Sequence, residues 1–244
     1  MNRRFLLALA TAACAILLAA APHHSQAQAA QSAPAKTAAH KKPSAAAKPD
    51  PAPAAPVLIS VNGVKDIDPQ KATGNTSAPV TMEVFSDFQC PACKQLYTNT
   101  TNRVIENYVN TGKVYFVHRD FPLPMHAYSR VAASYSRAAA HIGKCDAVEH
   151  ALFEKQAEWE ATGKVKETVA SVLTPVEMKK VQALVDAGTL EPLIEQDKKT
   201  GQLVPVNQTP TAILTARNGQ SYPVVGFVSY DVLKTFLDQL IAQK

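Results

Sequence analysis

The sequence predicts an α/β fold in which a mixed central sheet is flanked by helices and an all-helical subdomain is inserted into the chain. Three features carry this prediction. An apolar, β-branched stretch at 80–86 is followed by a helical stripe at 91–110. A helical pattern then runs from about 125 to 199. Strand signals return at 211–215 and 221–225, before a last helix.

The first predicted strand, VTMEVFS at 80–86, ends just before the tetrapeptide CPAC at 90–93. We interpret the strand as buried because its residues are mostly apolar and β-branched. Pro91 suits the first turn of the following helix, where its missing N–H costs nothing. The strand and the helix therefore place two cysteines at a helix N-terminus.

The second predicted strand, KVYFVH at 113–118, begins after Gly112 closes the helix. We interpret the polar triplet at 118–120 as a hydrogen-bonded strand end. His126 is expected to cap the inserted helices rather than to take part in chemistry. Within the helical block, breaks are expected near Gly143, Gly163, Pro175 and Gly188.

The C-terminal part reads as a hairpin and a helix. The strands at 211–215 and 221–225 are joined by a turn at Asn218-Gly219. Ser229 is expected to cap a final helix with one apolar face.

Residues 1–29 predict a signal peptide. Arg3 and Arg4 precede an apolar run, and Ala27-Gln28-Ala29 forms a small-x-small cleavage site. An uncleaved membrane anchor and a lipoprotein modified at Cys14 remain alternatives. The run is short for a span and rich in alanine, so we expect an exported protein of the periplasm or another extracytoplasmic space.

Residues 30–56 are almost entirely Ala, Pro, Lys and Ser, which predicts a disordered tether. The remaining stretch, 57–244, suits one domain. The formal net charge of the chain is +5, but six of its 25 Lys and Arg residues and only one of its 20 Asp and Glu residues lie before residue 57. The predicted domain is thus neutral, and its charge gives no reason to expect nucleic acid as a partner.

Three cysteines remain after signal removal: Cys90, Cys93 and Cys145. They are too few for a disulfide scaffold. A zinc site needs four ligands, and the histidines between 118 and 150 fit no zinc spacing. A structural disulfide between Cys90 and Cys93 would close a very small loop with little entropic benefit. We favour a redox pair over both alternatives and expect no metal and no cofactor.

The redox interpretation has a physical basis. Helix N–H groups and the helix dipole stabilise a thiolate at Cys90. An unperturbed thiol with a pKa of about 8.5 is only about 3% ionised at pH 7, whereas a pKa of about 5 would ionise nearly all of it. Cys93, one turn further on, is placed to attack a mixed disulfide formed at Cys90.

Four stretches together resemble the DsbA-like branch of the thioredoxin superfamily. They are FSDFQCPACK at 85–94, HRDFPL at 118–123, NQTPTAIL at 207–214 and NGQSYPVVG at 218–226. The resemblance runs from about Val80 to the C-terminus. It implies a thioredoxin fold with the helical subdomain at about 125–199 as an insertion.

The resemblance also implies site roles. Cys90 would be the exposed nucleophile and Cys93 the resolving cysteine, with Pro91 and Ala92 completing the active-site motif. A cis bond between Thr209 and Pro210 would lie beside them, where the backbone binds an extended substrate peptide and the proline blocks stray metal.

One departure concerns an acidic residue that many relatives carry six positions before the first cysteine. Here Val84 holds that position and the acid is Glu83, whose side chain should lie on the other face of the sheet. Asp87 is an alternative acid, although a loop aspartate is usually a turn or cap residue. Cys145, in an expected helix-break loop, is interpreted as an idle thiol, with a regulatory or intermolecular disulfide as the alternative.

The leading functional hypothesis is an exported thiol–disulfide oxidoreductase that donates disulfides to folding secreted proteins. Reduced or unfolded secreted proteins would be its substrates, a membrane redox partner would recycle its cysteines, and we expect a monomer. The alternatives are a disulfide isomerase or reductase, and a non-enzymatic thioredoxin-fold module that binds clients or copper. Pro210 argues against a metal carrier.

Overall fold

The computed structural model describes residues 57–204 and 206–243. The predictions of a signal peptide at 1–29 and a tether at 30–56 concern residues outside this part of the chain. No helix within the described part is both long and apolar enough to cross a bilayer.

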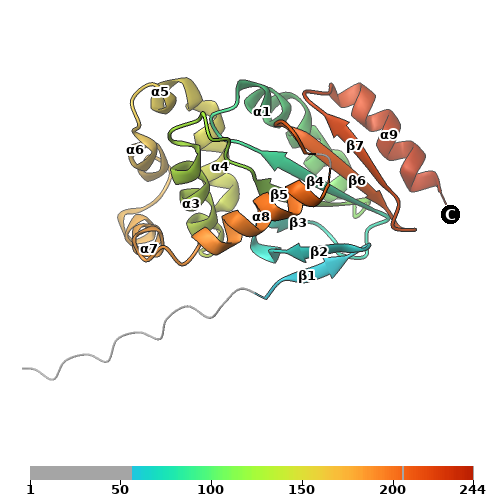
Figure 1. Cartoon of the computed structure of the whole chain (residues 1–244), viewed down its shortest axis with the longest axis horizontal. Helices are drawn as coiled ribbons and strands as arrows, with labels where there is room; N and C mark the ends of the chain where they lie inside the picture. Colours follow the sequence, from blue (N-terminus) through green and yellow to red (C-terminus); the bar gives the residue numbers. More distant parts are fainter. Residues whose placement is uncertain (1–56, 205, 244) are drawn as a thin grey trace, which may run out of the picture. The chain divides into compact units, whose positions relative to one another are not determined.

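The central sheet has five strands in the order β3-β5-β4-β6-β7 (Figure 1). Their bounds are Ala72–Thr73 for β3, Val80–Ser86 for β4, Val114–Asp120 for β5, Thr211–Ala216 for β6 and Ser221–Val225 for β7. β4 and β5 run parallel, and the other neighbours are antiparallel. The predicted mixed sheet is therefore confirmed, with β7 at one edge.

One continuous helical stretch joins β4 to β5, as predicted for 91–110. It ends at Val109 and is wound as a π-helix in two places. Its parts are α1 (Pro91–Leu96), η2 (Tyr97–Thr101), α2 (Asn102–Val104) and η3 (Ile105–Val109).

The C-terminal helix α9 (Tyr230–Ala242) covers the same face of the sheet (Figure 1). Ser229 is its N-cap residue, as predicted, although its side chain makes no capping hydrogen bond. The core between helices and sheet includes Met82 and Leu214 from the strands and Leu237 from α9, all fully buried. Such side chains each contribute about 1.5–3 kcal/mol when buried.

The predicted helical insertion is present between β5 and β6. Left-handed backbone at Gly143, Gly163 and Gly188 separates its helices, and Pro175 starts one of them, so the expected breaks are confirmed. The helices are α3 (Ser129–Ala140), α4 (Cys145–Glu154), α5 (Gln156–Glu160), α6 (Val165–Ala170), α7 (Pro175–Asp186) and α8 (Glu191–Leu203).

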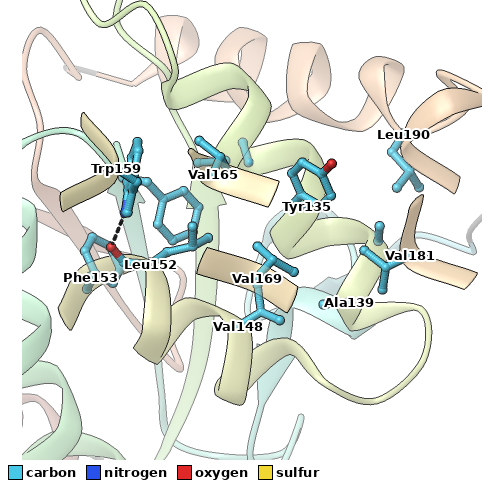
Figure 2. Packing of buried hydrophobic residues seen from close by; sticks show 14 of the residues in the cluster. Tyr135, Ala139, Val148, Leu152, Phe153, Trp159, Val165, Val169, Val181 and Leu190 are labelled. Carbon is cyan, nitrogen blue, oxygen red and sulfur yellow. Dashed lines mark hydrogen bonds between the residues drawn. The ribbon is translucent and has the colours of Figure 1, made fainter. Parts of the chain in front are cut away.

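The insertion has its own apolar core around the fully buried Trp159 (Figure 2). The Trp159 indole N–H donates to the Leu152 carbonyl oxygen at 2.7 Å, which satisfies its one polar group. Phe88, Cys90 and Cys93 belong to the same cluster. The helical insertion therefore packs directly against the cysteine motif.

A two-stranded hairpin precedes the sheet: β1 (Ile59–Val61) and β2 (Val64–Ile67). It packs on Tyr115 and Val117, on the sheet face opposite to α9. This hairpin was not predicted from the sequence. The available signal was the Asn62-Gly63 pair, because Asn-Gly favours a turn with positive φ at both residues. Both residues have positive φ in the structure.

Candidate functional site

The cysteine motif lies at the junction of β4 and α1. Cys90 is the N-cap residue in extended backbone, and its carbonyl oxygen accepts hydrogen bonds from the N–H groups of Cys93 and Lys94, each at 3.1 Å. Cys90 is 8% exposed and Cys93 is 2% exposed. The expectation that Cys90 is exposed is therefore wrong: the insertion packs against it and leaves only a small part of its surface open to solvent.

The two thiols differ in acidity. The pKa of Cys90 is lowered to about 5, first by a hydrogen bond from Cys93 and then by the Thr209 side chain and the N–H groups of Cys93 and Ala92. Burial, with the hydrogen bond to Cys90 and its charge, raises the pKa of Cys93 well above its usual value. At neutral pH the pair therefore holds a thiolate at Cys90 and a thiol at Cys93.

Thr209 and Pro210 lie beside this pair, although 119 positions separate Thr209 from Cys90. The bond between them is cis, as expected. The Cys90 sulfur lies 3.4 Å from the Thr209 carbonyl oxygen, to which Cys90 donates when it is protonated. The buried Thr209 hydroxyl has no hydrogen-bond partner in the described structure, so it is free to donate to the sulfur once Cys90 is ionised.

Gln156 of α5 holds the cysteine loop from the insertion side. Its amide nitrogen donates to the carbonyl oxygens of Phe88 at 2.6 Å and Cys90 at 3.1 Å. Sequence reasoning missed this residue, because no local pattern links a glutamine in a helix to a loop 66 residues away. Gln156 fixes the orientation of the Cys90 backbone at the start of α1.

Asp87 acts as a turn residue, with one oxygen accepting from the Gln89 N–H at 2.7 Å. Its other oxygen accepts from the Leu123 N–H at 2.7 Å and pairs with His126 at 2.8 Å. The prediction that His126 caps an inserted helix is therefore wrong. His126 instead fastens the loop after β5 to the cysteine loop, whose Asp87 N–H lies 3.4 Å from the Cys93 sulfur.

Glu83 lies on the sheet face away from the cysteines, as its register predicts. There its carboxylate binds Arg119 at 2.7 Å. Val84 shares the other face with Cys93, and the two line a common cavity. The position beneath Cys93 on β4 therefore carries an apolar side chain.

The polar triplet His118-Arg119-Asp120 belongs to β5 itself, which extends two residues beyond the predicted end. All three residues are buried. Arg119 binds Asp197 at 2.9 Å, and Asp120 binds Arg137 at 2.7 Å. The triplet is therefore the end of the strand, as interpreted, and its polar groups pair with residues of the insertion.

Cys145 is the first residue of α4 rather than part of a loop. Its thiol donates to Glu149 at 3.4 Å. Burial and the Glu149 charge raise its pKa, so the thiol stays protonated at neutral pH. This agrees with the idle-thiol interpretation; the alternative of a regulatory disulfide stays a prediction.

Comparisons with known proteins agree with this architecture. The thioredoxin family model matches residues 67–238, which is more than half of the chain. Disulfide bond formation protein D of Bacillus subtilis is 25% identical over 195 residues, covering 76% of this chain and 83% of that protein.

Two solved structures show the same fold. Wolbachia pipientis α-DsbA1 superposes with a TM-score of 0.60 at 20% identity, over 70% of this chain and 90% of that one. Oxidised BdbD from Bacillus subtilis gives 0.57 at 24% identity, over 71% of this chain and 94% of that one. The family model, the sheet order and the inserted helices agree, and the chain therefore belongs to the thioredoxin family.

Proposed function

We propose that this protein is an exported thiol–disulfide oxidoreductase that donates the Cys90–Cys93 disulfide to secreted proteins as they fold. The observation that carries the proposal is the divergence of the two thiols. A Cys90 pKa of about 5 beside a Cys93 pKa well above its usual value gives one good leaving group and one buried resolving thiol.

The exchange proceeds in two steps. A client thiolate attacks the Cys90 sulfur of the oxidised pair, the Cys90–Cys93 bond breaks, and its electron pair leaves on Cys93, which takes up a proton. A second client thiolate then attacks the client sulfur of the mixed disulfide. Cys90 leaves as a stabilised thiolate, and the client keeps the new disulfide.

The direction of transfer follows from the reduced state. Donors from Thr209, Ala92 and Cys93 stabilise the Cys90 thiolate, which exists only when the pair is reduced. Whatever stabilises the reduced pair makes the disulfide a stronger oxidant. Thr209 and Pro210, beside Cys90, would receive the client backbone, and a membrane redox partner would re-oxidise the pair after each cycle.

Replacing Cys93 by serine is expected to trap the first exchange. The reduced Cys93→Ser protein, mixed with a large excess of a disulfide-linked peptide dimer, should attach one peptide at Cys90 and release the other. In the same excess, which drives the exchange against the favoured direction, the reduced parent should release both peptides and end with its own disulfide, because Cys93 resolves the adduct. Mass spectrometry separates these products.

Cys145→Ser is the matched control and should behave as the parent. Oxidised parent should also convert a reduced two-cysteine peptide into its disulfide. Adducts that form on Cys90→Ser but not on Cys93→Ser would reverse the assigned roles, and an oxidised parent that leaves the reduced peptide unchanged would remove the proposed donor activity.

A further inference from the structure

A small cavity lies directly beneath the buried cysteine. Its volume is about 10 Å³, and Cys93, Ser86, Thr101 and His118 supply polar groups to its wall. A space of this size accommodates about one water molecule when polar partners surround it. Cys93 and His118 therefore border the same small space.

His118 reaches this face of the sheet through strand register. In the parallel pairing of β4 with β5, His118 lies directly opposite Val84. Neighbours in register point to the same side of a sheet, so the imidazole lies beside the apolar Val84 on the cysteine side. Glu83 is on the opposite face, and both carboxylate oxygens of Asp87 are already hydrogen-bonded.

The imidazole is held in place by the insertion. Its Nδ1 lies 2.9 Å from the Glu149 carboxylate of α4, and its ring stacks on Phe88 with centroids 5.2 Å apart. Burial alone would raise the pKa of Glu149, but the charges of His118 and Lys71 hold it well below its usual value. The second ring nitrogen, Nε2, is buried without a hydrogen bond, and Asp120 Oδ1 is 3.7 Å away.

A second cavity, of about 30 Å³, continues from His118 towards solvent. Lys71 and Glu149 line it, and so do the exposed residues Gln70, Thr73 and Asp146. Tyr97 also borders both cavities, but burial raises its pKa, so its phenol keeps its proton. The two cavities share Tyr97, Phe116 and His118, and of these His118 has the ring nitrogens that can both accept and donate a proton.

We propose that His118, positioned by Glu149, exchanges the Cys93 proton with solvent in each thiol–disulfide cycle, through one water in the cavity beneath Cys93. The inference rests on the proposed function and names a proton route for it. When a client attacks Cys90 and the Cys90–Cys93 bond breaks, imidazolium returns a proton to the departing Cys93 thiolate. In reverse, His118 takes that proton, and the Cys93 thiolate attacks Cys90 and expels the client thiolate.

The charged and titratable groups around His118 come from five other parts of the fold. They are Cys93 from α1, Tyr97 from η2, Lys71 from the short 3₁₀-helix η1 (Pro69–Lys71), Glu149, Asp146 and Cys145 from α4, and Arg137 from α3, with Asp120 on β5 itself. The imidazole thus lies among both carboxylates and cations.

The test follows the two release steps of a coloured aromatic disulfide added to the reduced protein. Cys90 attacks first and releases one coloured thiolate. Cys93 then attacks the mixed disulfide and releases the second. His118→Phe keeps the stacking on Phe88 but cannot accept a proton. His118→Gln keeps a hydrogen-bond donor for Glu149, and it serves as the test variant if His118→Phe fails to fold.

In both variants the first release should match the parent, and the second should slow about 100-fold at pH 7, which is the lower range for general acid–base catalysis. The slowed step should recover as pH rises and Cys93 ionises unaided. His141→Gln is the matched control, because this half-buried histidine lines neither cavity.

A folded His118→Gln protein whose second release keeps the parent's rate and pH profile would overturn the proton route while leaving the proposed function intact. A parent that releases no second thiolate would instead overturn the proposed function, and the proton route with it. The two failures are therefore distinguishable in one experiment.

Discussion

Arg137→Met is expected to lower the free energy of unfolding by about 3–5 kcal/mol, the usual cost of breaking a buried ion pair from one side. Arg137 is 1% exposed and binds three carboxylates: Asp68, Asp120 and Asp197. Methionine fills similar space but removes one cation from each of these buried carboxylates, of which Asp120 keeps Lys71 and Asp197 keeps Arg119. The loss is a large share of the roughly 5–15 kcal/mol that stabilises a typical domain.

Arg130→Met is the matched control in the same helix. Like Arg137, Arg130 binds carboxylates, here those of Glu191 and Glu195, but its side chain is 42% exposed. Solvent screens such pairs, and we expect a loss of about 0–1 kcal/mol. Denaturant unfolding at pH 7 measures both variants. Equal losses would show that the buried ion pairs linking α3 to β5 and α8 do not hold the insertion to the sheet.

The second large effect is a pH-dependent difference in stability between the reduced and oxidised protein. The Cys90 pKa falls from about 8.5 in the unfolded chain to about 5 when folded, and a lowered pKa stabilises the folded state above it. The stabilisation is complete above about pH 8.5 and disappears as pH falls towards 5. At pH 7 it amounts to about 3 kcal/mol in favour of the reduced form.

Cys93 and Cys145 contribute little in this window, because both keep their protons there in the folded state. Unfolding midpoints of the two redox forms between pH 5 and 8.5 test the effect. Groups with the same pKa in the reduced and the oxidised protein affect both midpoints equally, so they cancel in the difference between the two midpoints. Cys90→Ser, which has no thiolate at that position, should lose the part of the pH dependence that distinguishes the reduced from the oxidised parent. A difference that stays flat with pH would contradict the thiolate assignment.

Local patterns predicted much of the fold. The mostly apolar, β-branched run of β4, the Asn218-Gly219 turn and the apolar face of α9 each follow from their own residues, so their elements lie where expected. The acidity of the cysteine motif was predicted only in part. N–H groups at the helix start do lower the pKa of Cys90, but the hydrogen bond from Cys93 lowers it most, and burial is the main reason that the pKa of Cys93 is raised.

The remaining features depend on contacts between distant segments. His118, Arg119 and Asp120 were interpreted as a hydrogen-bonded strand end, but the sequence does not show which residues bind them. In the structure α3, α4 and α8 supply Arg137, Glu149 and Asp197 as their partners, so the strand continues. Neither the His118–Glu149 pair nor the contact of Gln156 with the Cys90 loop has a sequence signature.

The reduction potential of the Cys90–Cys93 pair tests the central claim most directly. The protein is equilibrated with glutathione buffers at pH 7, and the reduced fraction is counted by alkylation and mass spectrometry. The stabilised Cys90 thiolate predicts an oxidising couple, above about −200 mV but below the value of about −120 mV typical of the strongest oxidants of this kind. A potential at or below about −270 mV, in the thioredoxin range, would contradict the account and make the protein a reductant.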